Sequence, residues 1–176
     1  MKIVIPTSDT VPDRVLESLQ AQSLNVDVHV FKTSEKYVRD QTKKFVEEMH
    51  RRYQIIGKIR TQCLPELCTE EITVLNDRNL VHINSDNLKE MYDLLMSDDR
   101  IVAVSLAWIA KHWYKLHHAH MRNGCVMARR KVWENADFIP PNCGCTCIPF
   151  AKSARKLGDY RYLDLDTSRV KKIKGI

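Results

Sequence analysis

The sequence lacks a long apolar run. None of its 176 residues falls in a stretch of 18 consecutive apolar residues, whereas a membrane-spanning helix needs about 20. Met1 and Lys2 lead straight into residues 3–5, and Pro6 ends this apolar stretch, which is too short for a signal peptide. We therefore expect a soluble, cytoplasmic protein without a transmembrane segment.

Glycine and proline are also scarce, with 5 and 6 residues, and no low-complexity segment interrupts the chain. Because 44% of the residues are hydrophobic, a chain of this length can bury one core. The sequence predicts a single domain over residues 1–176.

The six cysteines lack the paired C-x-x-C spacing of a structural zinc site. Cys63, Cys68 and Cys125 are scattered, and the others cluster in residues 143–147. Zinc stays possible but is not favoured. We expect structural cysteines, either as buried thiols or as disulfides, and disulfides would fit a thermophilic host.

Four of the seven histidines lie in residues 112–120, among aromatic residues. A metal site is one interpretation, and a solvated, partly stacked surface is the more common one. The net charge of +6 comes from dispersed basic residues, which suits phosphate on a small ligand, an acidic lipid or a nucleic acid.

Strand and helix patterns alternate through the first 106 residues, which predicts an α/β fold with a doubly wound, mainly parallel sheet. We expect helices from residue 13, over 37–53 and over 88–96, and strands at 3–5, 26–30, 55–59, 80–84 and 101–106. Residues 60–68 are expected to form a turn or short helix. Later elements are a strand at 124–130, a helix from 131, a basic helix at 150–157 and a strand at 160–165.

The apolar residues 80–83 end abruptly in four polar residues, 84–87, before a helical pattern. Such a strand would present amide and carboxylate groups at the carboxyl edge of the sheet, where open α/β sheets bind ligands. In the alternative interpretation, Asn87 caps the helix with Glu90 as its capping-box partner.

Four segments, residues 2–7, 84–87, 124–130 and 154–158, together resemble the inverting family-2 glycosyltransferases of the GT-A fold. The resemblance implies an open, mixed, mainly parallel Rossmann-like sheet flanked by helices in a single domain. It places a nucleotide-sugar half at about 1–106 and an acceptor half at about 107–176.

By this resemblance, Asn84 and Asp86 form a DXD-like motif that holds a divalent cation, Mn²⁺ or Mg²⁺, which neutralises the leaving diphosphate. Asp86 is then the main ligand, and Asn84 offers a neutral oxygen to the metal or the ribose. The family's metal-ligating histidine aligns with Lys172, whose ammonium would neutralise the diphosphate directly. The alternative for Lys172 is an unstructured basic tail.

Pro6, Thr7 and Arg60 are the other donor-site candidates, since Arg60 resembles an arginine of the family's nucleotide pocket. Alternatively, Pro6 merely ends a strand and Arg60 lies in water. The family's catalytic Glu-Asp pair aligns with Thr146 and Cys147, which are not carboxylates, so the base is unassigned. The family's base-reading aspartate has no counterpart either, so the nucleotide cannot be named.

The carboxylates nearest to the missing base in sequence are Glu134 and Asp137. The resemblance implies an enzyme that moves a sugar from a nucleotide-diphosphate donor to a hydroxyl of a glycan or protein. A catalytically degenerate nucleotide- or glycan-binding module is the alternative, and a nucleic-acid binder rests on charge alone. The chain is also similar to compact glycosyltransferases of viruses of hot-spring archaea, which would place it in the host cytoplasm.

Overall fold

The computed structural model describes residues 1–34, 40–42, 44–107, 124–140, 146–164 and 170–172. Six strands form one sheet in the order β2-β1-β3-β6-β5-β7. Its strands are β1 (Lys2–Thr7), β2 (Asp27–Lys32), β3 (Ile72–Asn76), β5 (Ile101–Ala107), β6 (Cys125–Arg129) and β7 (Asp159–Asp164). β6 runs antiparallel to β3 and β5, and the other pairings are parallel. The predicted mixed, mainly parallel sheet is confirmed.

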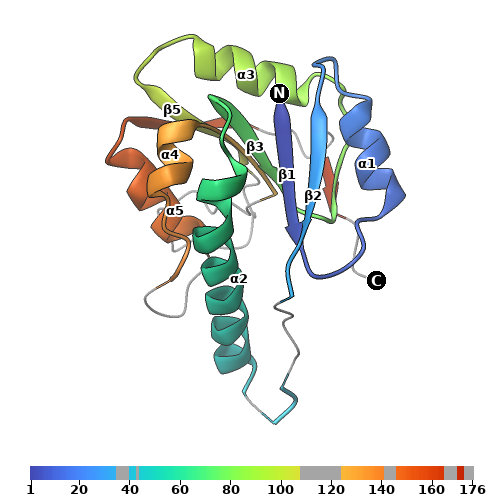
Figure 1. The fold of residues 1–176 in the computed structure, drawn as a ribbon, viewed down its shortest axis with the longest axis vertical. Coiled ribbons are helices and arrows are strands. Elements are labelled where there is room, and N and C mark those ends of the chain that lie inside the picture. The colour runs from blue at the N-terminus through green and yellow to red at the C-terminus, as the bar shows by residue number, and fades with distance from the viewer. Residues whose placement is uncertain (35–39, 43, 108–123, 141–145, 165–169, 173–176) are drawn as a thin grey trace.

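Helices cover both faces of the sheet (Figure 1). The helices are α1 (Asp13–Gln20), α2 (Phe45–Leu67), α3 (Asn87–Met96), α4 (Arg130–Asn135) and α5 (Cys147–Arg155). Along β1, Val4 packs into the core on the side of α2, α4 and α5, whereas Ile3 and Ile5 pack into the core under α1 and α3. This alternation follows from the two-residue period of a strand, and burial on both faces explains why strand residues are apolar in continuous runs.

The long helix α2 corrects two predictions. Residues 55–59 are not a strand, and residues 60–68 are not a separate turn, because one helix runs from Phe45 to Leu67. A Cβ on Gly57 would lie 2.3 Å from the carbonyl oxygen of Phe138, so this glycine lets the segment after α4 cross the helix closely. The amino-terminal half of α2 extends past the carboxyl ends of β1 and β2 (Figure 1).

Strand β3 was not predicted. It belongs to the main sheet, where it pairs with β1 and β6. The predicted strand at 80–84 is shortened to β4 (Leu80–His82), and β4 pairs only with β8 (Val170–Lys172) in a separate two-stranded sheet. The main-sheet strand that was predicted at 80–84 is therefore β3, one strand earlier in the chain.

The remaining described elements lie close to their predicted positions. Helices α1, α3, α4 and α5 and strands β1, β2, β5, β6 and β7 agree with the sequence patterns to within a few residues. None of the helices in the described parts of the chain is long and apolar enough to cross a membrane.

Candidate functional site

The carboxyl ends of β1 and β3 lie side by side, because these strands are parallel neighbours. β1 ends at Pro6 and Thr7, and β3 ends at Asn76, followed by Asp77 and Arg78. The chain continues from β1 to β2 on one side and returns to β3 on the other, so this is the point where the strand order reverses. Open α/β sheets bind ligands at such a point, outside the carboxyl ends of the strands.

Arg60 joins three elements at this edge. It lies on α2 and is only 7% exposed, so the alternative that it lies in water is wrong. Its Nη2 donates to Oδ1 of Asp77 at 2.7 Å, and its Nη1 donates to the Thr146 hydroxyl at 3.4 Å. The guanidinium carbon lies 5.9 Å from the centre of the Phe138 ring, a cation–π distance.

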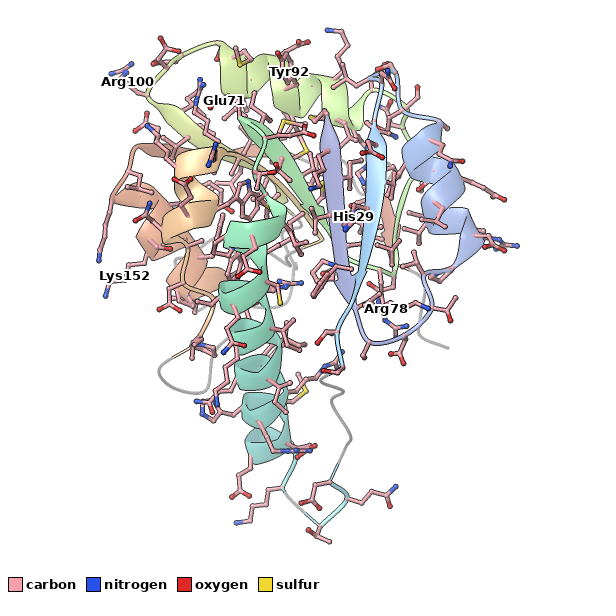
Figure 2. All side chains as sticks on the ribbon, viewed as in Figure 1. His29, Glu71, Arg78, Tyr92, Arg100 and Lys152 are labelled. Carbon is pink, nitrogen blue, oxygen red and sulfur yellow. The ribbon has the colours of Figure 1, made fainter. Side chains whose placement is uncertain are left out.

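A second arginine lies at the same edge and is partly exposed. Figure 2 shows Arg78 beyond the carboxyl end of β1, beside the loop that leads to α1. Its Nη2 is 3.3 Å from Oδ2 of Asp9, and its Nη1 donates to the Thr10 carbonyl at 3.5 Å. Thr7 fixes that loop, because its hydroxyl accepts from the Asp9 N–H at 3.0 Å and donates to the Asp9 carbonyl at 3.2 Å.

A buried hydrogen-bond network lies next to the turn formed by residues 77–80. The Asn76 amide nitrogen donates to the carbonyls of Asp77 at 3.0 Å and Leu80 at 3.5 Å, and its Oδ1 lies 3.0 Å from Nε2 of His82. Nδ1 of His82 lies 3.3 Å from the Asn87 amide nitrogen. Burial lowers the pKa of His82 to about 4, so the imidazole is neutral near pH 7. Nε2 then carries the proton and donates to Asn76, while Nδ1 accepts from Asn87.

Asn84 and Asp86 lie at the start of α3 rather than at the end of a strand of the main sheet. Oδ1 of Asn84 accepts from the Asp86 N–H at 2.8 Å, and the Asn84 carbonyl accepts from Gln22 at 3.1 Å. Asp86 is exposed, and its carbonyl accepts from the Glu90 N–H at 2.8 Å. These contacts turn the chain into the helix.

Asn87 does not occupy the N-cap position that the alternative interpretation gave it. Helix α3 begins at Asn87, which is fully buried, and the residue at its N-cap position is Asp86, without a side-chain cap. The Asn87 side chain contacts His82, so it links the helix to β4.

A metal site with several acidic or histidine ligands is absent from the residues that the structure describes: no group of three or more His, Cys, Asp or Glu could hold an ion there. At the edge of β1 and β3, the two carboxylates Asp9 and Asp77 each pair with an arginine. The two guanidinium groups offset the charge of the two carboxylates, so these four residues together attract a cation less than two unpaired carboxylates would.

The two candidates for the catalytic base, Glu134 and Asp137, contact different residues. Glu134 pairs with Arg130 at 2.8 Å on the exposed side of α4. Oδ1 of Asp137 accepts from the Ile139 N–H at 2.8 Å, and Asp137 directly precedes the Phe138 that contacts Arg60. These contacts do not identify either residue as the base. Thr146, which aligns with the family's catalytic acid pair, accepts a hydrogen bond from Arg60.

The backbone of Lys172 returns to this part of the molecule. In the β4–β8 pairing, Lys172 lies opposite Leu80, the last residue of the turn. Its side chain is not among the described groups, so its contact with a diphosphate stays a prediction. The described part of the tail, residues 170–172, is a paired strand rather than an unstructured segment.

The histidine-rich residues 112–120 and the cysteines at 143 and 145 lie outside the described residues, so their predicted roles are not tested. Cys68 and Cys125 are buried free thiols. Burial raises the pKa of Cys68 to about 12 and also raises the pKa of Cys125, which makes both thiols poor nucleophiles.

Sequence reasoning missed Asp9, Asp77 and Arg78. A signal was present: three of the four residues 72–75 are apolar and three are β-branched, and Asn76 and Asp77 follow them directly. Residues 80–87 show the same pattern of an apolar run that ends in polar residues.

No protein-family model and no curated protein matches the chain. Among solved structures, the mannosyltransferase PcManGT from Pyrobaculum calidifontis, in complex with GDP-Man and Mn²⁺, is similar with a TM-score of 0.61 at 17% identity. The match covers 95% of this chain but only 55% of that one, so the chain spans little more than half of the mannosyltransferase.

Two further solved structures are similar. Glucosyl-3-phosphoglycerate synthase from Mycobacterium tuberculosis, with Mn²⁺, UDP and phosphoglyceric acid, has a TM-score of 0.60 at 11% identity and covers 99% of this chain and 71% of its own. The catalytic domain of Drosophila β1,4-galactosyltransferase 7, with xylobiose, has a TM-score of 0.57 at 12% identity and covers 99% and 70%. The chain has the GT-A fold of glycosyltransferases.

Proposed function

We propose that the protein is a glycosyltransferase that moves a sugar from a nucleotide-diphosphate donor to a hydroxyl of a glycan or protein. The observation that carries this proposal is the polar cluster of Thr7, Asp9, Asp77 and Arg78 at the carboxyl edge where the strand order reverses. The solved structures with the same fold include complexes with GDP-Man and with UDP, which supports a nucleotide donor.

In this proposal the donor lies over the ends of β1 and β3. Pro6 and Thr7 form the floor under the nucleotide, and Asp77 offers a carboxylate oxygen to a donor hydroxyl while Arg60 holds the carboxylate in place. Asn84 and Asp86 remain a second candidate position for the donor, at the start of α3.

A divalent cation, when bound in a glycosyltransferase, neutralises the charge that develops on the leaving diphosphate. The similar mannosyltransferase and synthase are in complexes with Mn²⁺. Here each carboxylate at the edge of β1 and β3 already faces a guanidinium, so we do not assign an ion to this edge.

A nucleotide- or glycan-binding module without turnover is the second candidate. Thr146 and Cys147 stand where the resemblance expects the catalytic acid pair, and neither can accept a proton as a carboxylate does. Transfer would then depend on a base elsewhere, and of the two candidates Asp137 directly precedes Phe138, the residue whose ring lies under Arg60.

The test is release of nucleoside diphosphate from a panel of nucleotide sugars incubated with the full chain, with and without Mn²⁺. The proposal expects saturable release from one donor. Saturable binding without release would support the binding module instead. Binding to DNA or RNA with a steep salt dependence, and to no nucleotide sugar, would contradict both.

A further inference from the structure

We propose that Arg78 binds the diphosphate of the donor and supplies the positive charge that a divalent cation would otherwise supply. The inference rests on the proposed function, since it names how that same site recognises its ligand. It also goes beyond it, because it predicts nucleotide-diphosphate binding that needs no metal.

The position of Arg78 is the first argument. It lies just after β3, and its guanidinium reaches across to the loop after β1, so it spans the two strand ends between which open sheets bind ligands. Its side chain is 32% exposed, which leaves it accessible to a ligand, whereas Arg60 is buried.

The second argument is the hydrogen-bonding capacity of the guanidinium. An arginine has five N–H donors arranged in a planar fork, which matches the geometry of phosphate oxygens. Within the described part of the chain, Arg78 uses Nη2 for Asp9 and Nη1 for Thr10. Each of these two nitrogens carries two hydrogens, and Nε carries a fifth. N–H groups therefore remain that can donate to a diphosphate.

The charge at this edge is the third argument. Asp77 pairs with Arg60 at 2.7 Å, and Asp9 pairs with Arg78 at 3.3 Å. Two carboxylates matched by two guanidinium groups carry no net charge, so the protein groups at this edge attract a cation less than two unpaired carboxylates would. The Asp9 pair is long and partly exposed, so a diphosphate can compete for Arg78 at little energetic cost.

The rigidity of the turn that carries Arg78 is the fourth argument. The Leu80 N–H donates to the Asp77 carbonyl at 3.1 Å, and the Asp77 N–H donates to the Gly124 carbonyl at 2.7 Å. The buried side chain of Asn76 bonds both ends of the same turn. A cation on a fixed turn loses less conformational freedom when it binds a ligand than one on a loose loop.

The experiment measures the affinity of the full chain for UDP, GDP, ADP, CDP and dTDP, and for the matching nucleosides, by calorimetry in EDTA and then in Mn²⁺. We expect one diphosphate to bind in EDTA, with an affinity that Mn²⁺ changes by less than about threefold. Arg78→Ala should weaken the binding of that diphosphate at least tenfold, which corresponds to about 1.4 kcal/mol, and leave the binding of the nucleoside unchanged.

Two variants serve as controls. Arg100→Ala removes an exposed arginine that pairs with Asp98 on the turn between α3 and β5, and it should bind the diphosphate like the wild type. Arg78→Lys keeps the charge without the fork and should fall between wild type and Arg78→Ala. Thermal melting confirms that each variant is folded.

Two results would overturn the inference while the proposed function stands: diphosphate binding that disappears in EDTA and returns with Mn²⁺, or equal affinities of Arg78→Ala and Arg100→Ala. If the wild type binds no nucleotide in either buffer, the proposed function fails as well.

Discussion

Arg60 of α2 and Asp77 at the end of β3 form an ion pair with 2.7 Å between Nη2 and Oδ1, and the arginine side chain is the more buried partner, at 9% exposure against 20%. The pair joins the helix on one face of the sheet to the turn that carries Arg78. It therefore connects the packing of the core to the geometry of the candidate donor site.

Removing Asp77 should cost more stability than removing Arg60. Asp77→Leu leaves a buried guanidinium without its carboxylate, which we expect to cost about 3 kcal/mol. Arg60→Met leaves a carboxylate that water can reach, so the loss should be smaller. Urea unfolding of both single variants and the double variant measures the free energies of unfolding. If the two single losses add up to the loss in the double variant, the two residues are not directly coupled.

His82 should make the protein lose stability in mild acid. Its pKa is about 4 in the folded chain against 6.5 for the free group, so between these values the unfolded chain binds the proton and the folded chain does not. The contribution of His82 to the free energy of unfolding is fully present above pH 6.5 and falls by about 3 kcal/mol as the pH drops to 4.

The control for this prediction is His82→Gln, which cannot titrate. It should be less stable than the wild type at pH 7, because the network with Asn76 and Asn87 is altered, yet show a shallower decline between pH 6.5 and 4. Parallel stability curves for the two proteins would show that His82 is not the titrating group.

Gly57→Ala should destabilise the fold, although alanine is the better helix former by about 1 kcal/mol. The new Cβ would lie 2.3 Å from the Phe138 carbonyl oxygen, and backbone on both sides resists the shift, so we expect a net loss of about 1–3 kcal/mol. Lys58→Ala, at the exposed neighbouring position, should change the free energy of unfolding by much less. A Gly57→Ala variant as stable as the wild type would mean that the crossing is loose.

Deleting residues 170–176 should weaken nucleotide-diphosphate binding far more than nucleoside binding. The deletion removes β8, which pairs Lys172 with Leu80 beside the turn, and with it the charge predicted to offset the diphosphate. Lys172→Glu tests the charge while keeping the strand. Equal diphosphate binding by full-length, truncated and Lys172→Glu proteins would show that the tail has no part in the site.

The sequence was sufficient for those elements whose pattern is strong. α3 has a clear helical face, and β5 is a continuous apolar run, so both were located closely. It failed in α2, where Ile55, Ile56 and Ile59 around Gly57 look like a strand, because only the tertiary contact with Phe138 shows why a glycine lies in a helix.

The sequence analysis placed the strand of the main sheet at 80–84 instead of at β3 for a related reason. Residues 72–76 are preceded by two glutamates and followed by Asp77 and Arg78, so the short run resembles part of a connection. The pairing of β3 with β1 is non-local, and no pattern within 80–87 reveals that β4 lies outside the main sheet.

The most direct test of the account is nucleoside-diphosphate release from the donor that the wild type uses, measured side by side for Asp77→Asn and Asp86→Asn, with Asp93→Asn on the exposed face of α3 as the matched control. We expect release by the wild type, at least a tenfold lower rate for Asp77→Asn, and rates within about twofold of wild type for the other two variants. Loss in Asp86→Asn with full activity in Asp77→Asn would move the donor to the start of α3, and no release from any nucleotide sugar by the wild type would contradict a glycosyltransferase.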